Sequence, residues 1–135
     1  MSLATRIDEE GERLAAACTA CGACVRACPM TPFAPGVEAA DAGAVAAGMR
    51  ALLRGEEVAP EAIAWIGACT RSGQCTPACP ERLDVALMMR FVSMRARGAL
   101  GEAPRVAAKA DSGWSARVKA FARLTLTEEE QARWL

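Results

Sequence analysis

The sequence lacks histidine and tyrosine altogether, and aromatic residues make up only 4% of it. Without histidine the chain cannot form a Ser-His or Cys-His catalytic pair, a His-ligated zinc or haem site, or a Rieske centre. β-branched residues are scarce beside the many Ala and Arg, which argues against a sheet protein. Basic and acidic residues balance to a formal net charge of +0. Global charge therefore favours neither nucleic acid nor an anionic membrane as a partner.

Cysteine is the residue that the chain has in excess, with seven among 135 residues. The first ten residues carry charges where a secretory signal needs an apolar core, and no run approaches the roughly 20 apolar residues of a membrane span. We therefore expect a cytoplasmic protein without a membrane span, where disulfides are rare and clustered cysteines more often bind metal. An odd number of cysteines also fits poorly with a closed disulfide framework.

Apolar periodicity and capping residues predict an all-α chain. Helices are expected at 3–16, from the cap Asp41 to about Arg54, from Pro60 through Trp65, and from the cap Asp84 to about Gly98. The last of these has a methionine-rich face, which predicts core packing and is compatible with shielding a cofactor. Its residues are Val85, Met88, Met89 and Val92.

Beyond Gly101 the helical pattern weakens. A short helix is expected around Trp114, Val118 and Phe121, and Thr127 with Glu130 forms a capping box for a last turn that ends at Trp134. The sequence therefore predicts a domain at 1–101 and a C-terminal helical or extended tail at 102–135.

The first cysteine run reads C-x2-C-x2-C-x3-C-P and contains Cys18, Cys21, Cys24 and Cys28. Three cysteines spaced by two residues let one loop wrap an iron–sulfur cubane, and the small residues between them let backbone N–H groups approach the sulfides. The fourth cysteine can ligate a different cluster. Zinc, the main alternative, prefers two separated pairs of ligands. The spacing therefore indicates iron–sulfur ligation.

The second run has the same frame, with Ser72 in place of the second cysteine, and indicates a degenerate internal duplication. Its cysteines are Cys69, Cys75 and Cys79. If the fourth cysteine of each run crosses over, one cluster takes Cys18, Cys21, Cys24 and Cys79, and the other takes Cys28, Cys69 and Cys75. Four thiolates suit a [4Fe–4S] cluster and three suit a [3Fe–4S] cluster.

Ser72 leaves the second cluster open to alternatives. An intact [4Fe–4S] cluster could use Ser72 or water as its fourth ligand, although a Ser alkoxide has a far higher pKa than a thiolate and is a harder donor. Ser72 could also simply donate a hydrogen bond to a sulfide or bond the backbone.

Residues 14–98, with the two runs at 18–29 and 69–80, resemble the C subunit of heterodisulfide reductase. Trp65 before the second run and the helix from Asp84 after it support the resemblance. It implies an α-helical ferredoxin fold, shared with the C-terminal half of succinate dehydrogenase and fumarate reductase iron–sulfur subunits. It also implies electron transfer between a flavin or quinone-linked module and a cysteine-rich partner. In having Ser72, the second run is more similar to the [3Fe–4S] run of the succinate dehydrogenase subunit.

No residue has the character of a substrate-handling acid, base or nucleophile, so we expect no catalytic residue in this chain. The sequence predicts an electron-transfer subunit that relays electrons through two clusters within a larger oxidoreductase, beside a flavoprotein, a cysteine-rich reductase or both. The alternatives are an iron–sulfur redox sensor or interaction module, in which a labile cluster at Ser72 reports oxidation, and a structural zinc module.

The region from Arg90 to Arg123 has an excess of positive charge, opposed only by Glu102 and Asp111. Its basic residues are Arg90, Arg95, Arg97, Arg105, Lys109, Arg117, Lys119 and Arg123. Arginine and exposed aromatics are typical of protein interfaces, which predicts that the tail docks on a partner subunit. The alternatives are a solvated helical face and a tail that folds back to shield a cluster.

Overall fold

The computed structural model describes residues 1–106 and 114–134, and every regular element in those ranges is a helix. The expected all-α class is therefore confirmed. Two compact units divide the chain, Met1–Arg105 and Val106–Leu135. The first unit extends beyond Gly101 because the Arg105 N–H donates to the Ala96 carbonyl over 2.6 Å. The functional division of the chain into 1–101 and 102–135 stays a prediction.

The four predicted helices of the first unit are present as α1 (Leu3–Ala17), α3 (Ala42–Leu53), α4 (Pro60–Gly67) and α6 (Val85–Ala96). Their starts follow from local chemistry. The Asp41 carboxylate accepts from the Ala44 N–H and the Asp84 carboxylate accepts from the Leu87 N–H, each over 2.9 Å, while a proline opens α4. Each cap satisfies a backbone donor that the helix itself leaves free.

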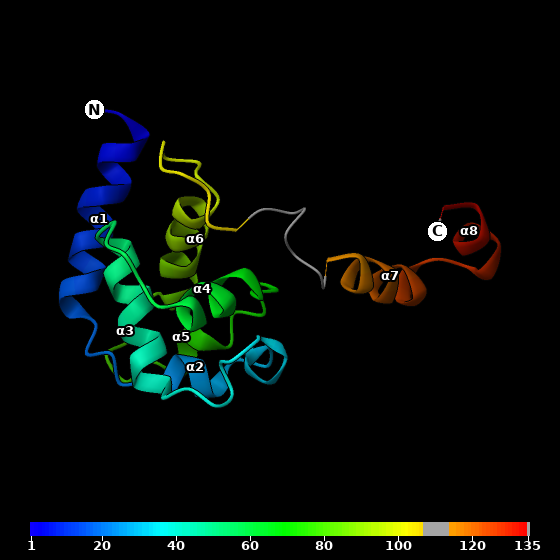
Figure 1. The fold of residues 1–135 in the computed structure, drawn as a ribbon, viewed down its shortest axis with the longest axis horizontal. Coiled ribbons are helices and arrows are strands. Elements are labelled where there is room, and N and C mark those ends of the chain that lie inside the picture. Colours follow the sequence, from blue (N-terminus) through cyan, green and yellow to red (C-terminus); the bar gives the residue numbers. More distant parts are fainter. Residues whose placement is uncertain (107–113, 135) are drawn as a thin grey trace. The chain divides into compact units, whose positions relative to one another are not determined.

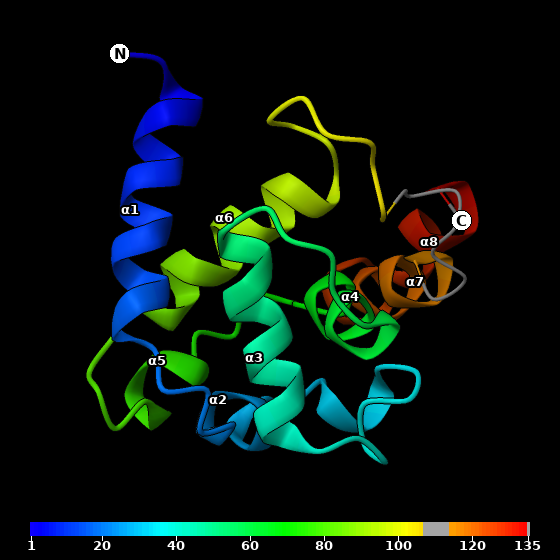
Figure 2. The same ribbon diagram turned by 60° about the vertical axis from the view of Figure 1, so that its left-hand side comes forward.

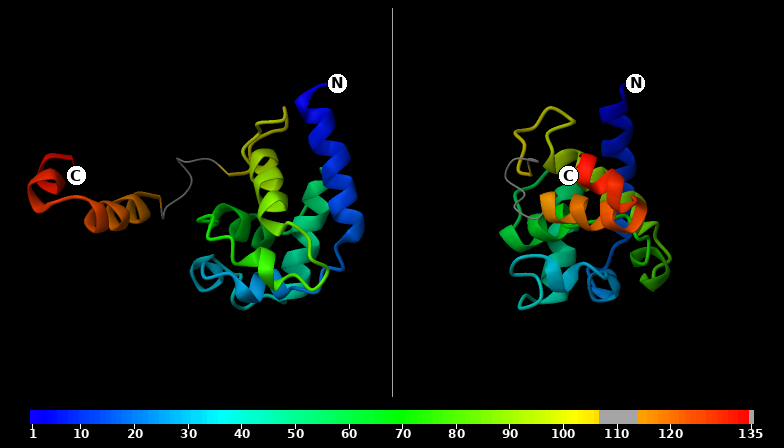
Figure 3. Two further views of the ribbon diagram at one scale, coloured as in Figure 1. Left: turned by 180° about the vertical axis from the view of Figure 1, so that it is seen from behind. Right: turned by 90° about the vertical axis from the view of Figure 1, so that its right-hand side faces the viewer.

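The core lies where α1, α3, α4 and α6 meet, as Figure 1 shows. Helix α3 contacts all three of the others, and α6 lies against both α1 and α4, which can be followed from behind in Figure 3. With few aromatics available, Leu and Met residues fill this space around the single buried Trp of the first unit. The largest fully buried side chains include Trp65, Leu14, Met49, Leu52 and Met88.

Two short helices that the sequence did not predict, α2 (Ala23–Ala27) and α5 (Cys75–Ala78), lie within the cysteine runs. They contact each other, and α2 also packs on α3 while α5 packs on α6. In Figure 2 the pair lies at the end of the bundle opposite the N-terminus. The 3-10 helix η1 (Thr31–Phe33) follows the first run. The bundle thus brings both cysteine runs together at one end.

The second unit consists of α7 (Trp114–Thr125) and α8 (Glu128–Trp134), as expected from the sequence. The predicted capping box is present, since the Thr127 N–H donates to the Glu130 carboxylate over 2.9 Å and the Glu130 N–H donates to the Thr127 hydroxyl over 3.3 Å. The predictions that involve Lys109, Asp111 and the Arg117 side chain lie outside the described residues. None of the helices in the described ranges is long and apolar enough to cross a membrane.

Candidate functional site

The loops that open the two cysteine runs follow the same backbone path. Two residues after the first cysteine of each run, Ala20 and Arg71 have φ of 54° and 61°, which non-glycine residues rarely adopt. Four residues after that cysteine, Gly22 and Gly73 have φ of 82° and 74°. The internal duplication is therefore present in the backbone, and Ser72 occupies the loop position that Cys21 occupies in the first run.

Each loop leads into a short helix that ends at the last cysteine of its run. Cys28 caps α2 with φ −71° and ψ 124°, and Cys79 caps α5 with φ −72° and ψ 118°. This extended conformation suits the residue before a proline, and Pro29 and Pro80 follow. Both runs therefore end in the same way, with the last cysteine in an extended conformation immediately before a proline.

A narrow hollow of about 20 Å³ gathers four cysteines from both runs. They are Cys18, Cys21, Cys24 and Cys79. One backbone N–H approaches a sulfur here, since the Ala20 N–H donates to Cys18 Sγ over 3.4 Å. Met49 from α3 and Met88 from α6 cover the hollow with apolar surface.

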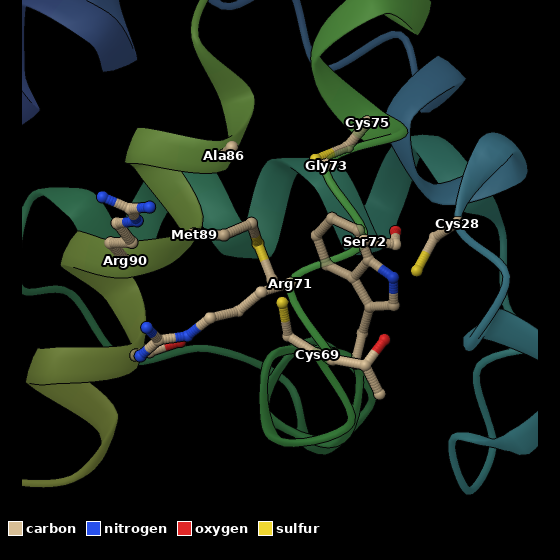
Figure 4. Close-up of a pocket in the computed structure, with 12 residues that line it drawn as sticks. Cys28, Cys69, Arg71, Ser72, Gly73, Cys75, Ala86, Met89 and Arg90 are labelled. Atoms are coloured by element: carbon tan, nitrogen blue, oxygen red, sulfur yellow. The ribbon is translucent and has the colours of Figure 1, made fainter. Parts of the chain in front are cut away.

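A larger hollow of about 180 Å³ gathers the other three cysteines, Cys28, Cys69 and Cys75. Figure 4 shows these three cysteines at separate positions around the space, with Ser72 between Cys28 and Cys75. Met89 from α6 also lines it. The methionine-rich face of α6 therefore contributes to the core and to both hollows. Met88 and Met89 are both buried, and Met88 lines the first hollow while Met89 lines the second.

The cysteines around the hollows are the two sets that crossed ligation requires. The donors suit iron–sulfur clusters, because thiolates are the usual ligands and each binds a separate iron. Among the residues that the structure describes, no three Cys, His, Asp or Glu side chains converge closely enough to hold a single metal ion. Ligation of two clusters by these sets stays a prediction.

Ser72 lies exposed at the second hollow. Its Oγ accepts a long hydrogen bond of 3.5 Å from the Gln74 N–H, which matches the expected alternative of a bond to the backbone. A contact of that length holds the side chain weakly. The nature of the second cluster therefore stays a prediction.

Two of the cysteines have thiol pKa values raised chiefly by burial. The pKa of Cys24 rises to about 11, with further increases from the charges of neighbouring cysteines that include Cys18 and Cys21. The pKa of Cys75 also rises, and the charges of Cys69 and Cys28 add to the effect of burial. Thiolates here are unfavourable by themselves, so they need cationic iron to stabilise them.

Sequence reasoning assigned no role at the site to three residues that the structure places there, Met49, Arg50 and Trp65. Arg50 of α3 donates to the Cys18 carbonyl over 3.0 Å, and Met49 beside it reaches the first hollow. The Trp65 side chain lines the second hollow, and its indole N–H is buried without a hydrogen-bond partner. The only signal in the sequence was the position of Trp65 shortly before the second run, whereas Met49 and Arg50 reach the site through the packing of α3.

A family model described as a 4Fe-4S dicluster domain matches residues 14–83, just over half of the chain. The matched segment contains all seven cysteines and ends immediately before the Asp84 cap of α6. Neither a curated protein nor a solved structure matches the chain.

Proposed function

Because this chain belongs to the 4Fe-4S dicluster domain family, we propose that it is a relay subunit of a larger oxidoreductase complex of the heterodisulfide reductase type. Family membership makes it an iron–sulfur protein of the electron-transfer kind. The observation that carries the finer proposal is the gathering of four cysteines around one hollow and three around the other.

The short helices explain how one domain could hold two clusters close together. In α2, Cys24 lines the first hollow and Cys28, at its end, lines the second. In α5 the order is reversed, with Cys75 at the second hollow and Cys79 at the first. Four residues of helix span about 6 Å, so each helix would fix the separation of the two clusters. A fixed short separation is what an electron relay requires.

The chain's own residues would bind the clusters and tune their environment. A bound cluster supplies one-electron chemistry, while the protein supplies thiolates, backbone N–H donors and an apolar cover. Met49 and Met88 would keep water from the first cluster. We place substrate chemistry on a partner, either a flavoprotein or a cysteine-rich reductase.

Partner docking is proposed for the second unit. Trp114, Phe121, Leu124 and Trp134 are all exposed in it, and such side chains are typical of interface hot spots. Two of the basic residues before this unit have other roles. Arg95 pairs with Asp8 and Glu102, and Arg105 pairs with Glu57, so these two arginines stabilise the first unit.

The direct test is iron and sulfide analysis with EPR spectroscopy on full-length protein purified without oxygen. We expect about seven irons and about eight sulfides per chain, and a [3Fe–4S] signal in the oxidised protein. About eight irons without that signal would favour a [4Fe–4S] cluster completed by Ser72 or water. Stoichiometric zinc without sulfide would overturn the proposal.

A second candidate function is an iron–sulfur redox sensor. The exposure of Thr70, Arg71 and Ser72 at the second hollow favours it, because an oxidant could reach a cluster there. Repeated cycles of oxidation and reduction separate the two functions. A relay subunit should keep its iron through the cycles, whereas a sensor should lose iron or change structure at the first oxidation.

A further inference from the structure

Trp65 contains an unusual buried donor. Its side chain is only 1% exposed, and its Nε1–H has no hydrogen-bond partner in the part of the chain that the structure describes. An indole N–H can only donate, and a buried donor without an acceptor destabilises the fold. The position therefore indicates an acceptor that the polypeptide alone does not provide.

The surroundings of Trp65 identify the acceptor by its chemistry. Its side chain lines the second hollow together with Cys28, Cys69 and Cys75. The other two buried side-chain atoms without a partner, among those described, belong to Arg95 and Glu102, which pair with each other. Trp65 is thus the one such donor at a cysteine hollow in the described residues. Cluster sulfides and ligating thiolates are anionic acceptors that would occupy this space.

We propose that the Trp65 indole N–H donates a hydrogen bond to the second iron–sulfur cluster, at a sulfide or a ligating thiolate. This proposal rests on the proposed function, because it requires a cluster at the second hollow. A donor stabilises the more negative, reduced cluster more than the oxidised one and so raises the reduction potential. Trp65 is a tuning residue that makes the second cluster easier to reduce than it would be without this hydrogen bond.

Substitution Trp65→Phe tests this role in the full-length, cluster-loaded protein. It removes the N–H donor and keeps an aromatic ring in the core. An EPR-monitored redox titration should show about a tenfold loss in the equilibrium constant for one-electron reduction of the second cluster, which is a fall of about 59 mV. The potential of the first cluster should stay unchanged. Trp114→Phe and Trp134→Phe are matched controls, because both tryptophans are exposed in the second unit.

A measurement on the unsubstituted chain keeps the test valid even if Trp65→Phe fails to fold. In protein labelled with ¹⁵N at the tryptophan indoles, pulsed EPR should detect one ¹⁵N coupled to the paramagnetic second cluster. The coupling should persist in Trp114→Phe and Trp134→Phe. Absence of this coupling, or an unchanged potential in a Trp65→Phe protein with both clusters, overturns the inference alone. A wild-type protein without a second cluster overturns the proposed function as well.

Discussion

Cys79 belongs to the second cysteine run by sequence, yet it lies at the same hollow as Cys18, Cys21 and Cys24. We expect Cys79→Ala to remove or destabilise the four-iron cluster, because that cluster loses one of its four thiolates. Cys75→Ala is the matched substitution, four residues away in the same short helix, and should remove the three-iron cluster. Iron content and EPR spectra of the two variants measure the outcome.

The two cysteine variants also test crossed ligation directly. If Cys79→Ala abolishes the [3Fe–4S] signal and leaves the four-iron cluster intact, each run serves its own cluster and the crossed assignment is wrong. The crossed assignment is supported if Cys79→Ala loses the four-iron cluster and Cys75→Ala keeps it.

Ser72 and Ser93 both line the second hollow, but only Ser72 occupies the loop position equivalent to Cys21. Substitution Ser72→Cys supplies a soft thiolate where a fourth iron would bind, so iron content should rise from about seven to about eight. The [3Fe–4S] EPR signal should disappear. The control variant Ser93→Cys introduces the same thiol into the same hollow and should retain the signal. An unchanged signal in Ser72→Cys would contradict a fourth-ligand position for residue 72.

Gly22 and Gly73 have equivalent conformations but different surroundings. A Cβ atom on Gly22 would lie 2.6 Å from the Ala42 carbonyl carbon at the start of α3, whereas nothing lies within 4 Å of a Cβ on Gly73. Gly22→Ala combines a steric clash with positive-φ strain and should destabilise the cluster-loaded protein by more than about 3 kcal/mol. Gly73→Ala adds only the strain, about 1–2 kcal/mol.

Thermal scans of the two glycine variants by circular dichroism, under anaerobic conditions and at one scan rate, compare these effects. The apparent melting temperature should fall further for Gly22→Ala. Equal decreases in the melting temperature of the two variants would mean that the first loop can move away from α3 with little loss of stability.

At the scale of helices, the sequence predicted the elements whose signals are local. Asp41 and Asp84 each cap a helix by accepting a hydrogen bond from a residue three positions later in the sequence. Thr127 and Glu130, also three positions apart, cap α8. The helices α2 and α5 were not predicted, because each is about one turn long and forms around the cysteines. Such short helices depend on packing against neighbouring elements rather than on helix propensity.

The features of the candidate site likewise fall into those that the local sequence predicts and those that depend on long-range packing. The cysteine spacing, with the condition that the last cysteine of each run crosses over, predicted the two sets that line the hollows. The meeting of thiols from both runs also requires α2 to pack on α5, and cluster ligation by these sets stays a prediction. The contacts of Arg50 with Cys18 and of Trp65 with the second hollow depend on how distant helices pack. No local pattern encodes such contacts, so the sequence identified Trp65 only as a neighbour of the second run.

Helix α6 is the element whose capping has the largest expected effect on the site. Asp84 caps it, and the same helix brings Met88 and Met89 to the two hollows. Asp84→Ala should lower the free energy of unfolding by about 1 kcal/mol and the melting temperature by about 4–8 °C. The control is Ser2→Ala, which removes the cap of α1 at the exposed N-terminus, where fraying should make the loss smaller. A larger loss in Ser2→Ala would contradict this ranking.

At the scale of the whole chain, the boundary of the first unit determines how the tail can be tested. Glu102 pairs with Arg95 over 2.6 Å, and Arg105 contacts Ala96 and Glu57. Truncation after Gly101 removes these contacts and leaves Arg95 without one of its two carboxylates, so this shorter protein should melt at a lower temperature. Truncation after Arg105 keeps the contacts and removes the second unit alone.

Comparison of the two truncations separates docking of the tail from its structural effects. If the second unit binds a partner, the protein cut after Arg105 should keep both clusters and its melting temperature, and lose the subunit that copurifies with the full-length chain. Iron analysis and quantitative pull-down from the native host measure both properties. If the protein cut after Arg105 instead loses a cluster and still retains the partner, the tail shields a cluster.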